Sequence, residues 1–157
     1  MVYILETKGK RLIDADIVVA ERKNIPLKKD GWKFNWKQLA QEQYTQTFIL
    51  KTMEFPQSIG GALHLKVESG MLIMDVVEIA AHNIGRKKKY DYVAGCLIAF
   101  ACRESFKLEG SYKGFLSFIS KTNLIKWYST KYGATLAFGQ LMFIDPEAGE
   151  KLINKYL

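Results

Sequence analysis

The segment Met71–Ala80 constrains the fold of this chain more than any other. It reads MLIMDVVEIA and carries apolar side chains at both odd and even positions. An extended segment of this kind needs apolar cover on both faces, as a central strand of a sheet has. The preceding segment, Gly60–Gly70, alternates apolar and polar residues, which predicts a half-buried strand ending in a turn at Ser69-Gly70. We therefore expect a sheet with other elements packed on both faces.

The rest of the chain supplies elements that can cover such a sheet. Helical spacing predicts a helix over about residues 92–108, which Gly110 ends, and a second that begins at Ser120 or Thr122 and ends at Gly133. Asp145-Pro146 opens a last helix. Further strands are predicted at 1–7, 16–22 (which can also be read as helix), 44–52, 114–120 and 134–144, the last as one strand or as two broken near Gly139, with an irregular segment at 25–36. The predicted class is α/β or α+β, with a mixed sheet and helices on its faces.

Length and composition indicate one soluble globular domain over residues 1–157. The chain is 48% hydrophobic and 25% charged, and it has no apolar run of the roughly 18–20 residues that span a bilayer. We therefore expect a cytoplasmic protein without membrane contact. Cys96 and Cys102 lie six residues apart in a predicted helix, too far apart to bridge, and we expect two buried thiols. His64 and His82 form no ligand pattern with them, so no metal site is expected.

The densest positive charge of the chain directly precedes the predicted helix at 92–108. Arg86, Lys87, Lys88 and Lys89 are consecutive, and the net charge is +7. Such a loop is most often a solvated surface, but a positive balance also favours polyanionic partners: nucleic acid, acidic protein or phosphate-bearing cofactors. A helix N-terminus attracts anions through its free N–H groups and its dipole. From the residues alone, both a solvated loop and an anion site therefore stay open.

Two carboxylates interrupt the central strand. A strict period of two places Asp75 and Glu78 on opposite faces of the sheet, which would exclude a catalytic pair. Glu78 lies at the strand end, where a glutamate can simply reach solvent. Asp75, deeper in the strand, is predicted to be a structural acid paired with a lysine or arginine. His82, in the following loop, is a further group that can deprotonate an amine.

The order of elements over about residues 60–133 resembles the GNAT (GCN5-related N-acetyltransferase) family. In that family the loop after a splayed central strand carries Arg/Gln-x-x-Gly-x-Gly/Ala. The corresponding run here is Lys89-Tyr90-Asp91-Tyr92-Val93-Ala94, followed by Gly95, with Lys89 at the Arg/Gln position and Tyr92 at the Gly position. The segment TNLIKWYSTKYGA is similar to the family's helix with a tyrosine shortly before a glycine; here Tyr128 precedes Gly133 by five residues.

The resemblance implies a mostly antiparallel central sheet flanked by helices, and acetyl-CoA as the cofactor. Backbone N–H groups of Tyr92, Val93, Ala94 and Gly95 would hold its pyrophosphate. The thioester would lie beside Ala80 and Ala81. The 3′-phosphate would lie near Lys87 and Lys88, with Arg86 and Lys89 close by. Asn123 would bind the pantetheine arm, Glu78 would be the base, and Tyr128 would be the acid that reprotonates the thiolate.

Two function hypotheses follow. The first is an N-acyltransferase that moves an acetyl group from acetyl-CoA to an amine on a small molecule or a protein. The alternative is a non-catalytic GNAT-shaped module in which Tyr92 fills the cofactor slot and the basic loop binds nucleic acid or a protein partner, with Tyr90 and Tyr92 stacking on bases. Trp32, Phe34 and Trp36 would line an acceptor pocket in the first hypothesis, and otherwise form a satellite core.

Overall fold

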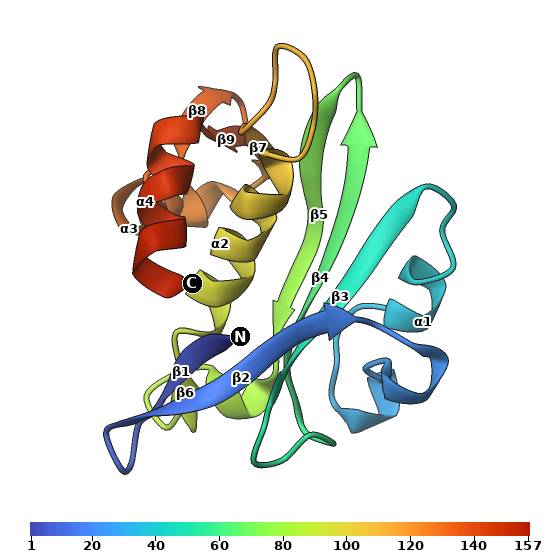
Figure 1. The fold of residues 1–157 in the computed structure, drawn as a ribbon, viewed down its shortest axis with the longest axis vertical. Coiled ribbons are helices and arrows are strands. Elements are labelled where there is room, and N and C mark those ends of the chain that lie inside the picture. The colour runs from blue at the N-terminus through green and yellow to red at the C-terminus, as the bar shows by residue number, and fades with distance from the viewer.

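A computed structural model describes residues 1–157, and its centre is one nine-stranded sheet (Figure 1). The strands are β1 (Val2–Glu6), β2 (Arg11–Val19), β3 (Thr45–Thr52), β4 (Ile59–Glu68), β5 (Met71–Ile79), β6 (Tyr90–Asp91), β7 (Leu116–Ile119), β8 (Thr135–Phe138) and β9 (Leu141–Ile144). The helices are α1 (Trp36–Leu39), α2 (Val93–Ser105), α3 (Ile125–Tyr132) and α4 (Pro146–Tyr156), with single 3₁₀ turns at Arg22–Asn24, Lys28–Asp30, Ala81–Asn83 and Thr122–Leu124.

The sheet is mixed and mostly antiparallel, as expected. Its strand order is β6-β1-β2-β3-β4-β5-β7-β9-β8, and only the β5–β7 pair is parallel. This pair is also the shortest contact between central strands, because it joins only Leu72 to Leu116 and Ile73 to Ser117. Beyond these residues the two strands separate. The sheet therefore opens beside the C-terminal half of β5.

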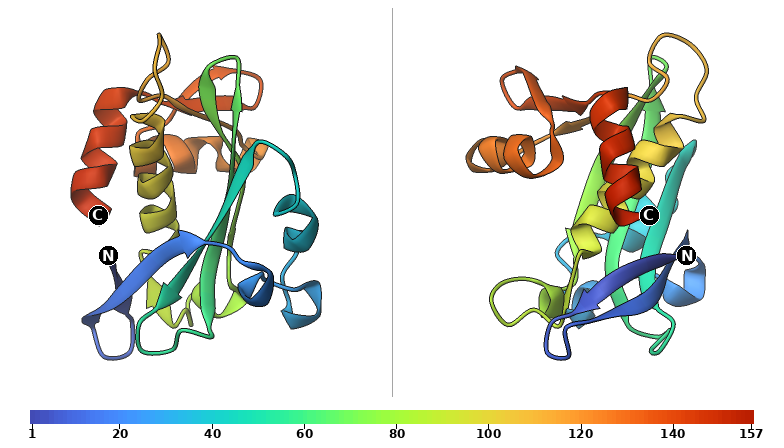
Figure 2. Two further views of the ribbon diagram at one scale, coloured as in Figure 1. Left: turned by 45° about the vertical axis from the view of Figure 1, so that its right-hand side comes forward. Right: turned by 60° about the vertical axis from the view of Figure 1, so that its left-hand side comes forward.

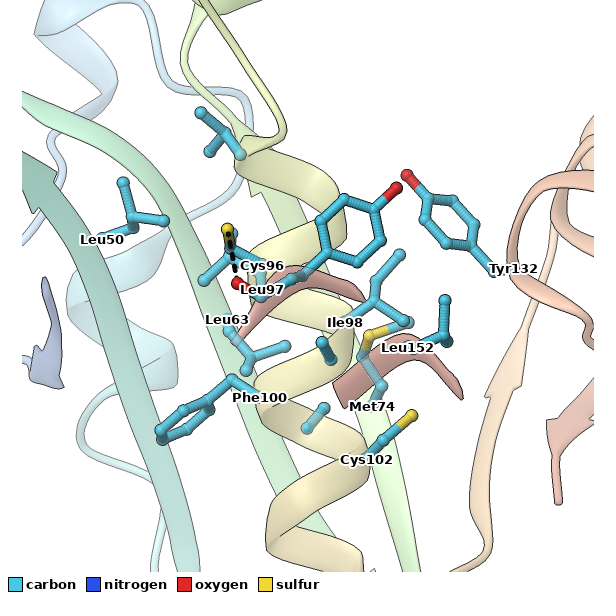
Figure 3. Close-up of a cluster of buried hydrophobic side chains, with 14 of the residues drawn as sticks. Leu50, Leu63, Met74, Cys96, Leu97, Ile98, Phe100, Cys102, Tyr132 and Leu152 are labelled. Atoms are coloured by element: carbon cyan, nitrogen blue, oxygen red, sulfur yellow. Dashed lines mark hydrogen bonds between the residues drawn. The ribbon is translucent and has the colours of Figure 1, made fainter. Parts of the chain in front are cut away.

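The helices cover both faces of the sheet. Figures 1 and 2 show α2 and α4 on one side of β3, β4 and β5, and α1 on the other. The main core lies under α2, where Leu63 and Phe100 lie to one side of the helix and Tyr132 and Leu152 to the other (Figure 3). A smaller cluster on the α1 face holds Trp36, Ile49 and Ala62. Both faces of β5 are thus covered, which explains its unbroken apolar pattern.

The C-terminal helix α4 packs antiparallel on α2, and two glycines permit the close approach. A Cβ on Gly95 would collide with the ring of Tyr156, and one on Gly149 would lie 3.4 Å from Cβ of Cys102. The two helices therefore meet along most of their length. The C-terminal turn of α4 lies beside the first turn of α2.

Most element predictions are confirmed, and two alternatives are settled. Residues 16–19 belong to strand β2, with Arg22 beginning a 3₁₀ turn, and residues 134–144 form two strands. The turn between β8 and β9 contains Gly139, whose φ of 57° is left-handed. Helix α2 ends at Ser105, three residues before the predicted end. No helix has the length and apolar character that crossing a membrane requires.

The prediction that Asp75 and Glu78 face opposite sides of the sheet is wrong. The β4–β5 register shifts between His64 and Leu65, which pair with Val76 and Met74, so Asp75 is the extra residue of a β-bulge. The bulge reverses the alternation, and both carboxylates lie on the α1 face. Asp75 lies near Lys66, as predicted for a structural acid, with 3.4 Å between its Oδ1 and the Lys66 Nζ.

Candidate functional site

The open edge of β5 forms one wall of the site. Strand β5 ends at Ile79, and the next N–H, of Ala80, donates to the Gly60 carbonyl at 3.0 Å. Because N–H groups alternate between the two edges of a strand, Val77 and Ile79 direct theirs toward the gap between β5 and β7. Their side chains pack against the main core. The gap is thus lined by the backbone N–H groups of Val77 and Ile79, and the apolar core lies beside it.

The first turn of α2 faces this gap with free donors. The N–H groups of Val93, Ala94 and Gly95 have no hydrogen-bond partner, as the first turn of a helix requires. The Tyr92 N–H donates to Oδ1 of Asp91 at 2.8 Å. A helix of 13 residues adds the positive end of its dipole. These free donors and the helix dipole are what the predicted phosphate site requires.

Tyr92 adopts the backbone conformation that explains the glycine of the resembling motif. Its φ is 75° and its ψ is 1°, in the left-handed region, and it precedes the first residue of α2. A bulky residue rarely adopts this conformation. Gly95 does not supply the left-handed residue, because its φ is not positive. It lacks a side chain because the Tyr156 ring lies where a Cβ would be. The chain therefore places a bulky residue in a backbone conformation that glycine adopts more easily.

A pocket of about 350 Å³ lies at this helix start, between α2, α3 and α4. Three lysines line it: Lys88 from the basic loop, Lys131 from α3 and Lys155 from α4. Tyr90 also lines it and is 4% exposed, and its buried hydroxyl has no hydrogen-bond partner. Because buried hydroxyls are normally hydrogen-bonded, this orphan hydroxyl is a group that a polar ligand could satisfy. The pocket has the charge and the donors to hold a phosphate-bearing molecule.

The basic loop contributes less to this pocket than the sequence predicted. Lys88 reaches it, with its Nζ 3.4 Å from Oδ1 of Asp91. Lys89 turns away, and its Nζ lies 5.2 Å from the centre of the Phe55 ring. Arg86 and Lys87 are exposed and do not line the pocket. Of the four predicted cations, the structure thus places only Lys88 at the helix start.

Two tyrosines of α3 point toward the site from successive turns. The Tyr128 ring lies 4.9 Å from that of Phe118, the first β7 residue past the last β5–β7 pair, so Tyr128 lies at the closed end of the gap. Burial raises the pKa of Tyr128, which keeps its hydroxyl protonated. Tyr132 lines the pocket itself, and its pKa is raised chiefly by burial. Asn123 lies in the turn before α3, is exposed and does not line the pocket.

Ala80 and Ala81 do not lie in the gap, contrary to the prediction. They line a second pocket of about 270 Å³ on the α1 face, with Glu78 and His82. The strand ends before them, and the Ala80 N–H is already bonded to β4. Since the gap opens after Ile73, the residues that flank it lie earlier in β5. Val77 and Ile79 supply the donors that we expected from the two alanines.

Glu78 tethers the segment between the second 3₁₀ turn and α1. Its carboxylate accepts hydrogen bonds from the Lys33 N–H at 2.7 Å, the Phe34 N–H at 3.2 Å and the Trp36 indole Nε1–H at 2.8 Å. Trp36 belongs to the satellite core, Trp32 lines the second pocket, and Phe34 is exposed. The satellite core is thus confirmed for Trp36, and an acceptor pocket at Trp32 stays a prediction.

His82 is the second titratable group beside this pocket. Partial burial, followed by the charge of Lys89, lowers the pKa of His82 below its ordinary value. The imidazole is therefore neutral at pH 7, which is the state that a general base requires. The second pocket places this neutral imidazole and the Glu78 carboxylate on one side of the end of β5. The pocket of about 350 Å³ at the start of α2, called the phosphate-type pocket below, lies on the other side.

Sequence reasoning missed the residues that α3 and α4 bring to the helix start. Lys131, Tyr132, Lys155 and Tyr156 all line the phosphate-type pocket, although they lie 36 or more residues after Gly95 in the chain. No local motif marks them. The available signal is a lysine next to a tyrosine in both helices, Lys131-Tyr132 and Lys155-Tyr156, which repeats one chemistry at two helix ends.

Comparison with known proteins identifies the fold. No family model and no curated protein sequence matches the chain. Among solved structures, the KacTA–DNA complex has a TM-score of 0.62 at 14% identity, covering 90% of this chain and 99% of that one. AtaTR bound with AcCoA has a TM-score of 0.61 at 11% identity, covering 88% and 98%. The spermidine/spermine N-acetyltransferase SpeG from Vibrio cholerae has a TM-score of 0.58 at 13% identity, covering 90% and 98%.

These neighbours are GNAT acetyltransferases, and the chain has their fold. The low identities fit a divergent sequence on that fold. One of the neighbouring structures contains acetyl-CoA. The fold is thus one that accommodates this molecule, and the residues of the present chain decide whether its own pocket suits it.

Proposed function

We propose that the protein is an N-acetyltransferase that binds acetyl-CoA at the first turn of α2 and transfers the acetyl group to an amine. The observation that carries this proposal is the pocket beside the open edge of β5. There the free N–H groups of Val93, Ala94 and Gly95 lie among three lysines and the orphan hydroxyl of Tyr90. Backbone donors and cations around one cavity suit a pyrophosphate, since both bind anions without a proton transfer.

The residues present fit acetyl-CoA in three respects. The first turn of α2, with Lys88, Lys131 and Lys155, would hold the phosphates. Val77 and Ile79 would direct N–H groups at the acyl end through the open edge of β5. Tyr128 lies where the gap closes, protonated and able to donate. When bound, acetyl-CoA supplies an activated acetyl thioester.

On the other side of the strand end, His82 is the group that we assign to deprotonate the amine. Its imidazole is neutral at pH 7 and lines the second pocket. The three hydrogen bonds to Glu78 occupy both of its carboxylate oxygens, so we propose that Glu78 acts on the amine only through water. The pocket contains two acidic residues, Asp30 and Glu78, which favour a cationic amine before it loses its proton.

Thermal unfolding with and without acetyl-CoA tests the proposal. The wild type should unfold at a higher temperature in acetyl-CoA, because a ligand that binds only the folded state stabilises it. Ala94→Glu should lose this shift, since the new carboxylate occupies the anion position. A glutamate in the first turn stabilises a helix, so the variant should remain folded. Ala137→Glu, at an exposed residue of β8 outside this pocket, is the control and should keep the shift. An unchanged melting temperature at millimolar acetyl-CoA would contradict the proposal.

A non-catalytic binding module is the second candidate, and one observation favours it. Tyr92 is 40% exposed at the position of the motif's glycine, next to the exposed cations Arg86 and Lys87. An aromatic ring beside cations suits single-stranded nucleic acid. Such binding should weaken steeply with salt, as phosphate contacts require. A titration of single-stranded RNA at two salt concentrations distinguishes the candidates, since the enzyme has no need for this affinity.

A further inference from the structure

Three side chains with metal-ligating atoms converge on the α1 face of the sheet, away from the phosphate-type pocket. They are Glu42 from the loop after α1, His64 from β4 and Asp75 from the β5 bulge. The His64 Nε2 lies 3.2 Å from Oε2 of Glu42 and 3.9 Å from Oδ2 of Asp75. All three ligand atoms lie within 4.8 Å of one another. No local pattern marks this cluster in the sequence, because its members are 11 to 33 residues apart.

The separations suit one small cation. Zinc binds imidazole nitrogen and carboxylate oxygen at about 2.0–2.2 Å. Two ligands around a tetrahedral ion at those distances lie about 3.3–3.6 Å apart. The two nitrogen–oxygen separations, 3.2 and 3.9 Å, bracket this range. The Glu42 and Asp75 oxygens lie within 4.8 Å of each other, and both side chains are partly exposed, so they could close around an ion.

The histidine is positioned as metal-ligating histidines usually are. Its side chain is fully buried, and its Nδ1 lies 2.8 Å from the Thr47 hydroxyl oxygen. A partner on the second ring nitrogen fixes the ring and its tautomer. When Nδ1–H donates to Thr47, the Nε2 lone pair faces the two carboxylates, and a cation between them removes the repulsion. The arrangement thus provides an oriented nitrogen ligand with its supporting hydrogen bond.

Asp75 reaches the cluster from the α1 face of β5. Alternation from Met71 and Ile73 places it on this face, and the bulge turns Val76 and Glu78 to the same face. Lys66 lies 3.4 Å from the other Asp75 oxygen and also pairs with Glu68, so it orients the aspartate from outside. Two carboxylates balance a dication. The fourth coordination position would face the partly exposed side of the cluster.

We propose that Glu42, His64 and Asp75 bind one divalent transition-metal ion, with Zn²⁺ as the best match and a water molecule as the fourth ligand. The imidazole favours zinc over calcium or magnesium, which prefer oxygen ligands. The ion would fasten the loop after α1 to the middle of the sheet. The cysteines are poor competitors, because burial raises the pKa of Cys96 and of Cys102 to about 12 and keeps both thiols protonated.

Calorimetric titration of the metal-free chain with Zn²⁺ tests the proposal. The wild type should bind one equivalent, and Glu42→Gln and Asp75→Asn should each weaken binding at least tenfold. Glu109→Gln removes an exposed carboxylate that lies outside the cluster, and should bind zinc as tightly as the wild type. Glu42 is exposed, so its variant should fold even if the Asp75 variant does not.

A second measurement locates the ion. The chain has two histidines, and ¹⁵N spectra of their rings separate them. Zinc should shift the Nε2 resonance of His64 and leave His82 unchanged. The proposal is overturned if no zinc binds, if Glu42→Gln and Asp75→Asn bind it as tightly as the wild type, or if only the His82 ring responds. In those cases the cluster is a hydrogen-bonded network that joins the loop to the sheet.

Discussion

Tyr92 shows how a single residue can depart from a motif while its backbone keeps to it. Its left-handed φ of 75° is the conformation for which glycine is the usual residue. The ring lies edge-on to that of Tyr156, with 6.1 Å between the centres. The contact with α4 offsets part of the backbone cost. The sequence flags the substitution, but the retained conformation follows only from the structure.

A matched pair of variants separates these two effects. Tyr92→Gly and Tyr92→Ala both remove the ring, but only alanine keeps the cost of the left-handed conformation. We expect the glycine variant to be more stable than the alanine variant by about 1 kcal/mol, as measured by urea unfolding. An alanine variant of equal or greater stability would show that residue 92 is not left-handed in solution.

Glu78 is expected to stabilise the fold as well as line the second pocket. Glu78→Gln replaces one acceptor oxygen by an amide donor that faces the same N–H groups. Since hydrogen bonds to a charged group contribute about 1.5–3 kcal/mol each, we expect a loss of about 2 kcal/mol in the free energy of unfolding. The Trp36 indole N–H resonance should also shift. Glu68→Gln, which breaks an exposed ion pair, should cost less than about 1 kcal/mol. Equal losses would contradict the tether.

The pKa of His82 offers a test of the local field. Burial lowers it most, and the charge of Lys89 lowers it further. Lys89→Ala removes one of these causes, so the midpoint should rise toward the ordinary value of about 6.5. Lys87→Ala, an exposed neighbour in the same loop, is the control. The ring resonances of His82 report the midpoint in an NMR titration. A midpoint that falls or stays constant in Lys89→Ala would exclude the predicted coupling.

At the scale of elements, the contact between α2 and α4 shapes the phosphate-type pocket. Gly95 lies in the first turn of α2 and Tyr156 in the last turn of α4, and no Cβ fits between them. Both residues also line the pocket. The position of α4 therefore sets the width of the pocket, and a change in its packing should reach the binding site.

Gly95→Ala should destabilise the protein, although alanine is the better helix former by about 1 kcal/mol. Overpacking of a tight contact costs about 1–3 kcal/mol, so the net loss should be up to about 2 kcal/mol. Tyr156→Ala removes the opposing ring, and the double variant should recover the helix preference. Urea unfolding of the two single variants and the double variant measures this coupling. Additive losses would contradict the close contact.

Periodicity predicted most elements because it reports burial. The apolar pattern of β5 and the helical stripe of α2 follow directly from their cover on both sides. The bulge at Asp75 escaped prediction because it depends on pairing with β4, and one extra residue reverses every later side chain. The missed bulge also affected the prediction of the site, since both Asp75 and Glu78 lie on the α1 face. Patterns thus fix element type more firmly than register.

At the scale of the whole molecule, the phosphate-type pocket is assembled from segments that are remote in sequence. The basic loop and α2 supply one wall, and α3 and α4 supply Lys131, Tyr132, Lys155 and Tyr156. Sequence reasoning found the first wall because a motif lies there. It could not find the second, which depends on how α3 and α4 return to the start of α2. The net charge of +7 is consistent with an anionic ligand but does not place it.

The central claim is that acetyl-CoA binds between the first turn of α2 and the open edge of β5. The most direct test is a titration of the ¹⁵N-labelled chain with acetyl-CoA, followed through its backbone amide resonances. The largest shifts should occur at Val93, Ala94 and Gly95, whose N–H groups are free, and at Val77 and Ile79. Val67, at the far end of β4, should not respond. Shifts confined to Arg86 and Lys87, or none at millimolar acetyl-CoA, would contradict the account.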